Sequence, residues 1–307
     1  MEFRFQECKS PCKLVLNFSK FFFCFFKRSS LVYLIKTDVD GNEQWSKTFG
    51  GSDYDYGTSV QQTTDGGFII AGYIYSFIAE DSDVYPIKTD VDGNEQWSKT
   101  FGGSDYDYGK SVQQTVDGGF IIAGSTESFG AGEGDAYLIK TDIDSNEQWS
   151  NTFGGSDDDG GASVQQTADG GFIIAGCTES IGPLCDDVYL VKTDIDGNEQ
   201  WSNTFGGSNL DQGTSVQQTT DGGFIIAGLT DLGESDAVYL IYYKPPITVT
   251  SPNGGEELSA GENFEIIWTS DVDIDFVKIE YSVNSGSGWM EIVASTEKDG
   301  SYLWEVL

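Results

Sequence analysis

The hydrophobic positions of this chain fall into short runs, separated by turns rich in glycine and aspartate. The apolar run FIIAG follows Asp-Gly-Gly four times, at Asp65, Asp117, Asp169 and Asp221. A continuous apolar run of this length, bounded by turn residues, predicts a strand buried on both faces. No segment has the spacing of an amphipathic helix. We therefore expect an all-β protein in which Asp-Gly turns join short strands into hairpins.

Residues 31–244 consist of near-identical units. Trp45, Trp97, Trp149 and Trp201 each stand in the motif NEQWS and are 52 residues apart. Every complete unit contains SVQQT, then FIIAG, a variable loop, a segment like VYLIKT, and EQWS, and a GGS-acidic link leads to the next unit. Four short strands in about 50 residues are typical of a propeller blade. The units therefore predict a propeller-type array of four-stranded blades.

The number of blades stays open. Complete units begin at Ser59, Ser111 and Ser163, and the first VYLIKT could join the last SVQQT and FIIAG as a fourth blade. A further copy, YLIYY at Tyr239, competes for the same place. We expect a partial array or about four blades, and favour a partial array from a longer gene, or a chain truncated upstream, over a closed four-bladed ring. Pro86 replaces leucine in one copy and has no amide hydrogen, which predicts a bulge or a frayed strand.

Pro245 and Pro246 mark a boundary, and the pattern changes after it. Segments such as ENFEIIWTS and DFVKIEYSV alternate apolar and polar residues, which predicts an immunoglobulin-like β-sandwich at residues 247–307. Because such sandwiches run to about 100 residues, we expect this one to be incomplete.

The motifs GGFIIAG and VYLIKTDVDGNEQW resemble a kelch-type blade. They are more similar to the short β-propeller repeats of secreted bacterial and archaeal proteins, which share the GGS-acidic-G link and the DGG-aliphatic-AG strand. The segment SPNGGEELSAGENFEIIWTS resembles the KNH-type β-sandwich module of surface proteins. The resemblance implies an extracellular or cell-surface location.

Residues 1–30 differ from the repeats. They carry six basic and two acidic side chains, and their apolar run FFFCFF is too short to span a membrane. No small-residue cleavage site follows this run. We interpret residues 1–30 as a leader-like or non-native segment that is unstructured, and we expect no membrane span.

Composition excludes several functions. The 307 residues include 50 acidic and 16 basic side chains, for a net charge of −34, so nucleic acid and anionic membrane surfaces are poor partners. The chain has no histidine, which removes the usual general base and zinc ligand. Cys177 and Cys185 flank one variable loop, and either a disulfide or two unrelated thiols fits this spacing.

Two sets of residues are candidates for ligand contact. Alternating carboxylates beside glycines would suit a weak calcium site in each link, although solvated Asp-Gly connections explain them better; these residues are Asp53, Asp55, Asp105, Asp107, Asp157, Asp159 and Asp211. No other cofactor is expected. The tryptophans are interpreted as packing between blades, and Tyr54, Tyr56, Tyr106 and Tyr108 as more exposed side chains.

Most variation between the repeats falls in the loop after FIIAG. Because loops on a rigid scaffold usually carry recognition, we place the partner surface there; its candidate residues are Tyr73, Tyr75, Glu80, Asp81, Glu127, Glu133, Glu179 and Asp186. The leading hypothesis is an exported, non-catalytic binding or scaffold protein with a protein or glycan partner. One alternative is a glycan hydrolase or lyase with two carboxylates about 5–10 Å apart. Another is a purely structural component of a cell envelope.

Overall fold

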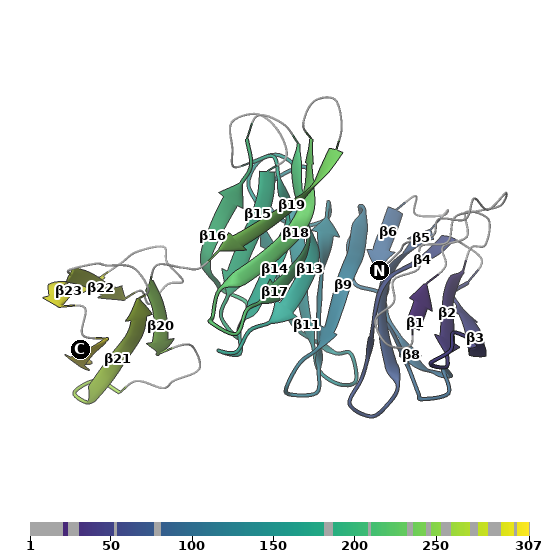
Figure 1. Cartoon of the computed structure of the whole chain (residues 1–307), viewed down its shortest axis with the longest axis horizontal. Coiled ribbons are helices and arrows are strands. Elements are labelled where there is room, and N and C mark those ends of the chain that lie inside the picture. Colours follow the sequence, from purple (N-terminus) through teal and green to yellow (C-terminus); the bar gives the residue numbers. More distant parts are fainter. Residues whose placement is uncertain are drawn as a thin grey trace. The chain divides into compact units, whose positions relative to one another are not determined.

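A computed structural model describes most of the repeats and parts of the C-terminal region. The described residues are 21–23, 31–51, 54–76, 81–180, 187–207, 210–231, 236–243, 247–252, 259–270, 276–281, 290–297 and 300–306. Within these ranges every regular element is a strand, and the strands form small antiparallel sheets (Figure 1). The prediction of an all-β protein is confirmed. Among these same residues, no helix is long and apolar enough to cross a membrane.

The chain divides into two compact units, residues 1–164 with 178–181, and residues 165–177 with 182–307. The division falls inside the third repeat and not at the two prolines. The domain boundaries that we drew from the sequence, and the propeller arrangement itself, stay predictions.

The first unit contains three sheets (Figure 1). The first has the strand order β1-β2-β3, with β1 (Phe21–Phe23), β2 (Val32–Thr37) and β3 (Glu43–Phe49). The second contains β4 (Tyr54–Gln62), β5 (Phe68–Ser76), β6 (Asp81–Val84), β7 (Ile87–Thr89) and β8 (Glu95–Ser98). The third is formed by β9 (Asp107–Gln114), β10 (Phe120–Thr126), β11 (Asp135–Thr141) and β12 (Glu147–Phe153).

The third sheet shows how one repeat folds. Its strands pair in the order β12-β11-β10-β9, so each strand lies beside the one that follows it in the chain. Gly118, in the turn between β9 and β10, has a φ of 88°, which glycine adopts without strain. All four predicted strands are present, which confirms the four-stranded unit. The first strand starts earlier than expected, because Asp107 and Tyr108 of the acidic link already pair with β10.

Residues 1–30 need a correction. Phe21–Phe23 is not unstructured but forms β1, which pairs with Leu34–Lys36 of β2. It occupies the place beside β2 that FIIAG occupies beside the equivalent strand in the complete repeats. Residues 1–20 and 24–30 lie outside the described residues.

Pro86 interrupts its strand as predicted. In the second repeat β11 is one strand of seven residues, whereas its counterpart around Pro86 is split into β6 and β7. Val84 and Ile87 still pair with β5, and neither Tyr85 nor Pro86 belongs to a strand. The missing amide hydrogen of proline accounts for the break.

The third repeat forms the sheet β13-β14-β15-β16, with β13 (Asp159–Gln166), β14 (Phe172–Thr178), β15 (Asp187–Thr193) and β16 (Glu199–Phe205). The last repeat has three strands, β17 (Asp211–Gln218), β18 (Phe224–Asp231) and β19 (Asp236–Tyr243). In this sheet β19 pairs with β18 in the register that β11 has with β10. The degenerate copy YLIYY therefore takes the third place, which resolves the competition noted in the sequence.

The C-terminal residues form two further sheets. One has the order β20-β21-β24, with β20 (Ile247–Ser251), β21 (Asn263–Ser270) and β24 (Ser301–Glu305). The other pairs β22 (Phe276–Tyr281) with β23 (Met290–Glu297). Trp268 and Trp304 of the first sheet share one hydrophobic cluster with Val277 and Ile279 of the second. Two sheets around a common core fit a sandwich, while the immunoglobulin-like topology stays a prediction.

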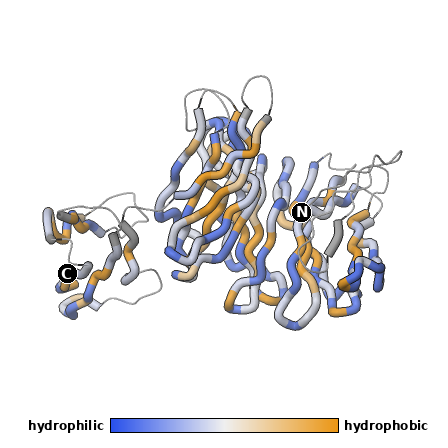
Figure 2. The backbone as a smooth tube through the Cα atoms, viewed as in Figure 1, coloured by the Kyte–Doolittle hydropathy of each residue, from blue (hydrophilic) through white to orange (hydrophobic). Residues whose placement is uncertain are grey.

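Hydrophobic residues are concentrated along the strands, and many residues of the turns are hydrophilic (Figure 2). Phe68, Ile69 and Ile70 are fully buried, which confirms that FIIAG is covered on both faces. Three of the repeat tryptophans pack edge-on against the phenylalanine of the next repeat: the centroid distance is 5.7 Å for Trp45–Phe68, Trp97–Phe120 and Trp201–Phe224. These three tryptophans therefore pack between repeats, as predicted.

Polar side chains in SVQQT and next to it join neighbouring repeats. Gln61 Oε1 accepts a hydrogen bond from the Gln114 amide at 2.6 Å, and Gln114 Oε1 accepts one from the Thr64 amide at 2.8 Å. Thr58 donates to the Gly109 carbonyl at 2.8 Å. These bonds hold the first strands of consecutive repeats side by side. They also give hydrogen-bond partners to backbone groups that face the neighbouring sheet.

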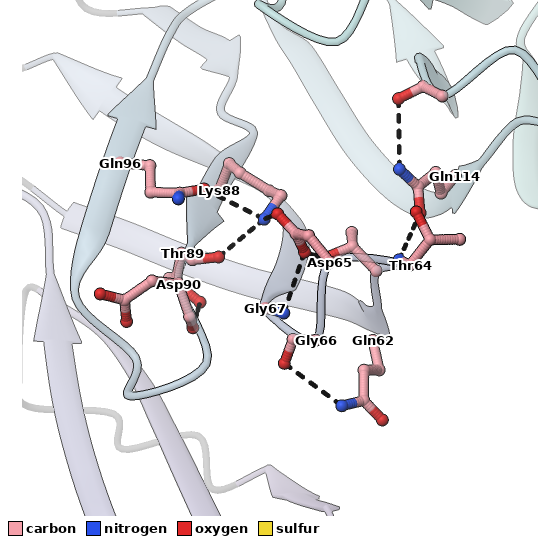
Figure 3. A network of polar contacts seen from close by, with 12 residues as sticks. Gln62, Thr64, Asp65, Gly66, Gly67, Lys88, Thr89, Asp90, Gln96 and Gln114 are labelled. Atoms are coloured by element: carbon pink, nitrogen blue, oxygen red, sulfur yellow. Dashed lines mark hydrogen bonds and ion pairs between the residues drawn. The ribbon is translucent and has the colours of Figure 1, made fainter.

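A buried lysine anchors three of the four Asp-Gly-Gly turns, and Figure 3 shows the one at Asp65. Lys88 Nζ donates to Asp65 Oδ2 at 2.8 Å, to the Thr89 carbonyl at 2.8 Å and to Gln96 Oε1 at 3.1 Å. The aspartate also accepts hydrogen bonds from Thr63 Oγ1 and from the Gly67 amide. The same ion pair joins Lys140 to Asp117 and Lys192 to Asp169. In this way the turn is fixed to the third strand of its own sheet.

The Asp65 turn makes a pH-dependent contribution to stability. Burial alone would raise the pKa of Asp65, but hydrogen bonds from Lys88, Thr63 and Gly67 and the charge of Lys88 lower it to about 2, from an ordinary value of 3.8. A lowered pKa in the folded state stabilises the fold above the unfolded-state pKa, and this stabilisation is lost as the pH falls toward 2.

We therefore expect Asp65→Asn to be less stable than the wild type by a constant amount above about pH 5, with the difference shrinking between about pH 4 and 2. Chemical denaturation of both proteins across this range measures the difference in unfolding free energy. The changing repulsion among the other carboxylates is common to both proteins and cancels in this difference. A difference that stays the same down to pH 2 would contradict this assignment.

Candidate binding surface

A cluster of five tyrosines lies on three strands of the first two repeats. In β4 exposed and buried side chains alternate, so Tyr54 and Tyr56 share one face while Asp55 faces inward. Cross-strand pairing places Tyr73 of β5 opposite Tyr56. Tyr108 of β9 and Tyr106, which precedes it, come from the next repeat. We call Tyr54, Tyr56, Tyr73, Tyr106 and Tyr108 the tyrosine cluster.

The rings of the cluster form a continuous series. Tyr56 and Tyr73 are stacked with centroids 4.7 Å apart, and Tyr108 meets Tyr73 edge-on at 4.9 Å. At the ends, Tyr54 lies 6.5 Å from Tyr56, and Tyr106 lies 6.2 Å from Tyr108. All of these separations are within or close to the range in which aromatic pairs attract each other. The cluster therefore links two repeats through side-chain packing and still exposes part of its rings.

One cation accompanies the cluster. Lys110 Nζ lies 5.1 Å from the ring centroid of Tyr108 and 5.6 Å from that of Tyr73, within the range of a cation–π interaction. Burial, and then the neighbouring Tyr56, raises the pKa of the Tyr73 phenol. Burial followed by the charge of Glu127 raises the pKa of Tyr108. Both phenols are therefore neutral near pH 7 and act as hydrogen-bonding groups on an aromatic surface.

The cluster is not a requirement of the repeat. Asp158 and Gly160 in the third repeat, and Leu210 and Gln212 in the last one, stand where the second repeat has Tyr106 and Tyr108. The position of Tyr73 is likewise serine, cysteine or leucine in the other repeats. The same sheet therefore forms without tyrosine at these positions, whereas the core motifs are almost invariant within this chain.

The predicted loop residues lie in more than one kind of place. Tyr73 and Tyr75 are not in a loop: they belong to β5, which extends to Ser76 because β4 pairs with it back to Tyr54. Asp81 begins β6. Glu127, Glu133 and Glu179 are exposed. Glu80, Asp186 and Cys185 lie outside the described residues, so the disulfide between Cys177 and Cys185 stays a prediction.

The second aspartate of each link also needs a correction. Asp55, Asp107, Asp159 and Asp211 were expected in solvated connections, but all four are buried in the first residues of their strands. Each Oδ2 accepts a hydrogen bond from a glycine amide four residues earlier, as Asp107 does from Gly103 at 2.8 Å. The carboxylate thus closes the glycine turn.

The neighbouring aspartates of the links do not share this environment. Asp105 and Asp157 are exposed, and Asp53 lies outside the described residues. In the part of the chain that the structure covers, no three acidic or cysteine side chains are grouped where they could hold a metal ion. The calcium sites remain a sequence-based prediction.

No protein-family model matches the chain, and no curated protein matches it. Among solved structures the chain is similar to the tail fiber of Staphylococcus aureus phage P68, with 8% sequence identity and a TM-score of 0.25. The match covers 64% of this chain and 51% of the tail fiber chain, so this chain spans about half the length of that protein. With so low a TM-score, the description of the fold rests on the strands and pairings given above.

Proposed function

We propose that this chain is an exported or cell-surface protein without catalytic activity, and that it binds a glycan or protein partner through the tyrosine cluster. The observation that carries this proposal is the series of ring contacts from Tyr54 to Tyr106 at positions where the repeats otherwise diverge. The wider surface includes the exposed Glu127 beside Tyr108.

Tyrosine suits such a surface for physical reasons. The side chain has a large apolar ring and a polar hydroxyl, and it has only two rotatable bonds to immobilise on binding. Here Tyr73 and Tyr108 are already held in place by packing, which reduces the entropy lost when a partner binds. The exposed Tyr54 and Tyr56 then supply the area that a sugar ring or a peptide side chain would cover.

Charge narrows the class of partner. With a net charge of −34, the chain repels polyanions, so acidic polysaccharides and nucleic acids are disfavoured at moderate salt. Neutral glycans and neutral or basic peptides remain. Among these we favour neutral glycans, because Tyr73 and Tyr108 already hold Lys110 as their cationic neighbour.

The structural roles of two buried aspartates support the proposal that the chain has no catalytic activity. Asp107 and Asp159 each accept hydrogen bonds from a glycine amide and from a serine hydroxyl, Ser128 or Ser180. They act as structural acceptors within the fold. Near-identical repeats also provide few of the different groups that an active site brings to one point.

An exchange between repeats tests the proposed surface. We expect Tyr106→Leu combined with Tyr108→Gln, which copies Leu210 and Gln212 of the last repeat, to weaken binding to neutral oligosaccharides at least about tenfold. Binding is measured on an array of neutral and acidic oligosaccharides and then by calorimetry on those that bind.

Ile195→Ala is the matched control, because Ile195 is an exposed apolar side chain on a hairpin turn of the third repeat. Thermal unfolding shows whether the exchange leaves the fold intact. If the exchanged protein folds and binds every oligosaccharide as the wild type does, the tyrosine cluster is not the binding surface.

A further inference from the structure

The last repeat has an apolar face that is exposed among the residues that the structure describes. On β19, Val238 is 83% exposed and Leu240 is 66% exposed. Tyr242 continues the same row, and Leu229 of β18 pairs with Val238 and is also exposed. We call Leu229, Val238, Leu240 and Tyr242 the terminal face. Exposed apolar patches of this kind commonly mark interaction sites.

Contacts inside the molecule show what covers this face in other repeats. Val188 and Leu190 of β15 are the counterparts of Val238 and Leu240, and both are 0% exposed. They are packed against Phe224, Ile226 and Ile241 of the following repeat.

The same contact occurs between the first two sheets of the chain. Val32 and Leu34 of β2, again the counterparts of Val238 and Leu240, are packed against Phe68 and Ile70 of the next sheet. In both places, the valine and leucine of one strand are covered by the next repeat, through a face that carries phenylalanine and isoleucine.

In the other repeats, one face of the sheet packs against the preceding repeat. The equivalent face of the first sheet is less buried. In the first sheet, Tyr33 and Ile35 of β2 are only half-buried. Their counterparts in the second repeat, Tyr137 and Ile139, are buried in a cluster with the preceding repeat. We call Tyr33 and Ile35 the leading face. Two incompletely covered faces of complementary type are thus present on one chain.

We propose that the terminal face binds the leading face of a second copy of this chain, so that copies associate head to tail. The first sheet of one copy then stacks on the last sheet of another as the next repeat would. The interface is heterologous, because different surfaces meet, and it can therefore continue from copy to copy. It uses a contact that the repeats already make within the chain.

Sedimentation velocity and light scattering of the whole chain over about 1–100 µM test this association, at about 0.3 M salt to screen the acidic charge. We expect species heavier than one 33.4-kDa chain that grow with concentration. Leu240→Lys should weaken the association at least about tenfold, because a charge would be buried in the interface. Leu240 is exposed, so this change leaves the fold intact.

Two further variants complete the design. Val116→Lys adds the same charge at an exposed turn position and should leave the association unchanged. Ile35→Lys blocks the leading face, so a mixture of Leu240→Lys and Ile35→Lys chains should form two-chain complexes that do not grow further. A wild-type chain that stays at the mass of one copy throughout this range overturns the proposal, as does association that Leu240→Lys leaves unaltered.

Discussion

Replacing Gly124 with alanine will lower the free energy of unfolding of the second repeat by at least about 3 kcal/mol. A Cβ atom at this position would lie 1.7 Å from the carbonyl oxygen of Tyr108 and 2.8 Å from its carbonyl carbon. Both are backbone atoms of the neighbouring strand, so no side-chain rotation can relieve the clash. The register between β9 and β10 shifts here, next to Ala123, which brings the two backbones together.

The last glycine of FIIAG is under this constraint in other repeats as well. A Cβ at Gly72 would lie 1.7 Å from the Tyr56 carbonyl oxygen, and one at Gly228 would lie 1.9 Å from that of Gln212. The motif therefore ends in glycine because of a close approach of backbones and not because of a turn.

Gly160→Ala is the matched control for Gly124→Ala. Gly160 is also a strand glycine, but a Cβ there would have its nearest neighbour at 3.7 Å, in ordinary van der Waals contact. We expect it to change the free energy of unfolding by less than about 1 kcal/mol. Urea denaturation followed by tryptophan fluorescence compares the two variants. Equal effects would show that the close approach at Gly124 is not limiting.

Much of each repeat was predictable because its signals are local. FIIAG, the Asp-Gly turns and NEQWS each specify a strand or a turn within a few residues, and the contact between Trp97 and Phe120 follows from a periodic tryptophan in a stacked array. Pro86 was predictable for the same reason, since the missing amide hydrogen belongs to the residue itself.

The remaining features depend on pairing register, which the sequence pattern does not show. Asp107 is buried because β9 starts inside the acidic link, and only the pairing with β10 reveals that start. The tyrosine cluster requires Tyr73 to lie opposite Tyr56 and beside Tyr108 of another repeat. The glutamines of SVQQT bond to the next repeat, and these bonds link residues about 50 positions apart.

Removing Asp117 is expected to cost about 2–3 kcal/mol, because it leaves the ammonium group of Lys140 buried without its counter-charge. The side chain of Lys140 is 5% exposed, and its Nζ lies 2.8 Å from Asp117 Oδ2. After Asp117→Ala, Lys140 Nζ would keep its hydrogen bonds to the Thr141 carbonyl and to Gln148 Oε1, both of which are uncharged acceptors. We place the cost below the usual range for a buried pair because Asp117 itself is half-exposed. Hydrogen exchange of the β10 and β11 amides measures this local loss.

The last repeat provides a control within the same chain, since Tyr242 stands where the other repeats have the buried lysine. Its hydroxyl donates to Asp221 Oδ2 at 2.6 Å, and Thr219 donates to the same carboxylate as Thr115 does to Asp117. Asp221→Ala removes an equivalent turn aspartate but leaves no buried charge behind. We therefore expect it to accelerate exchange in β18 and β19 by a smaller factor, corresponding to about 1 kcal/mol. Equal losses in the two repeats would mean that the aspartate stabilises its turn alone, and that the lysine charge adds nothing to the cost.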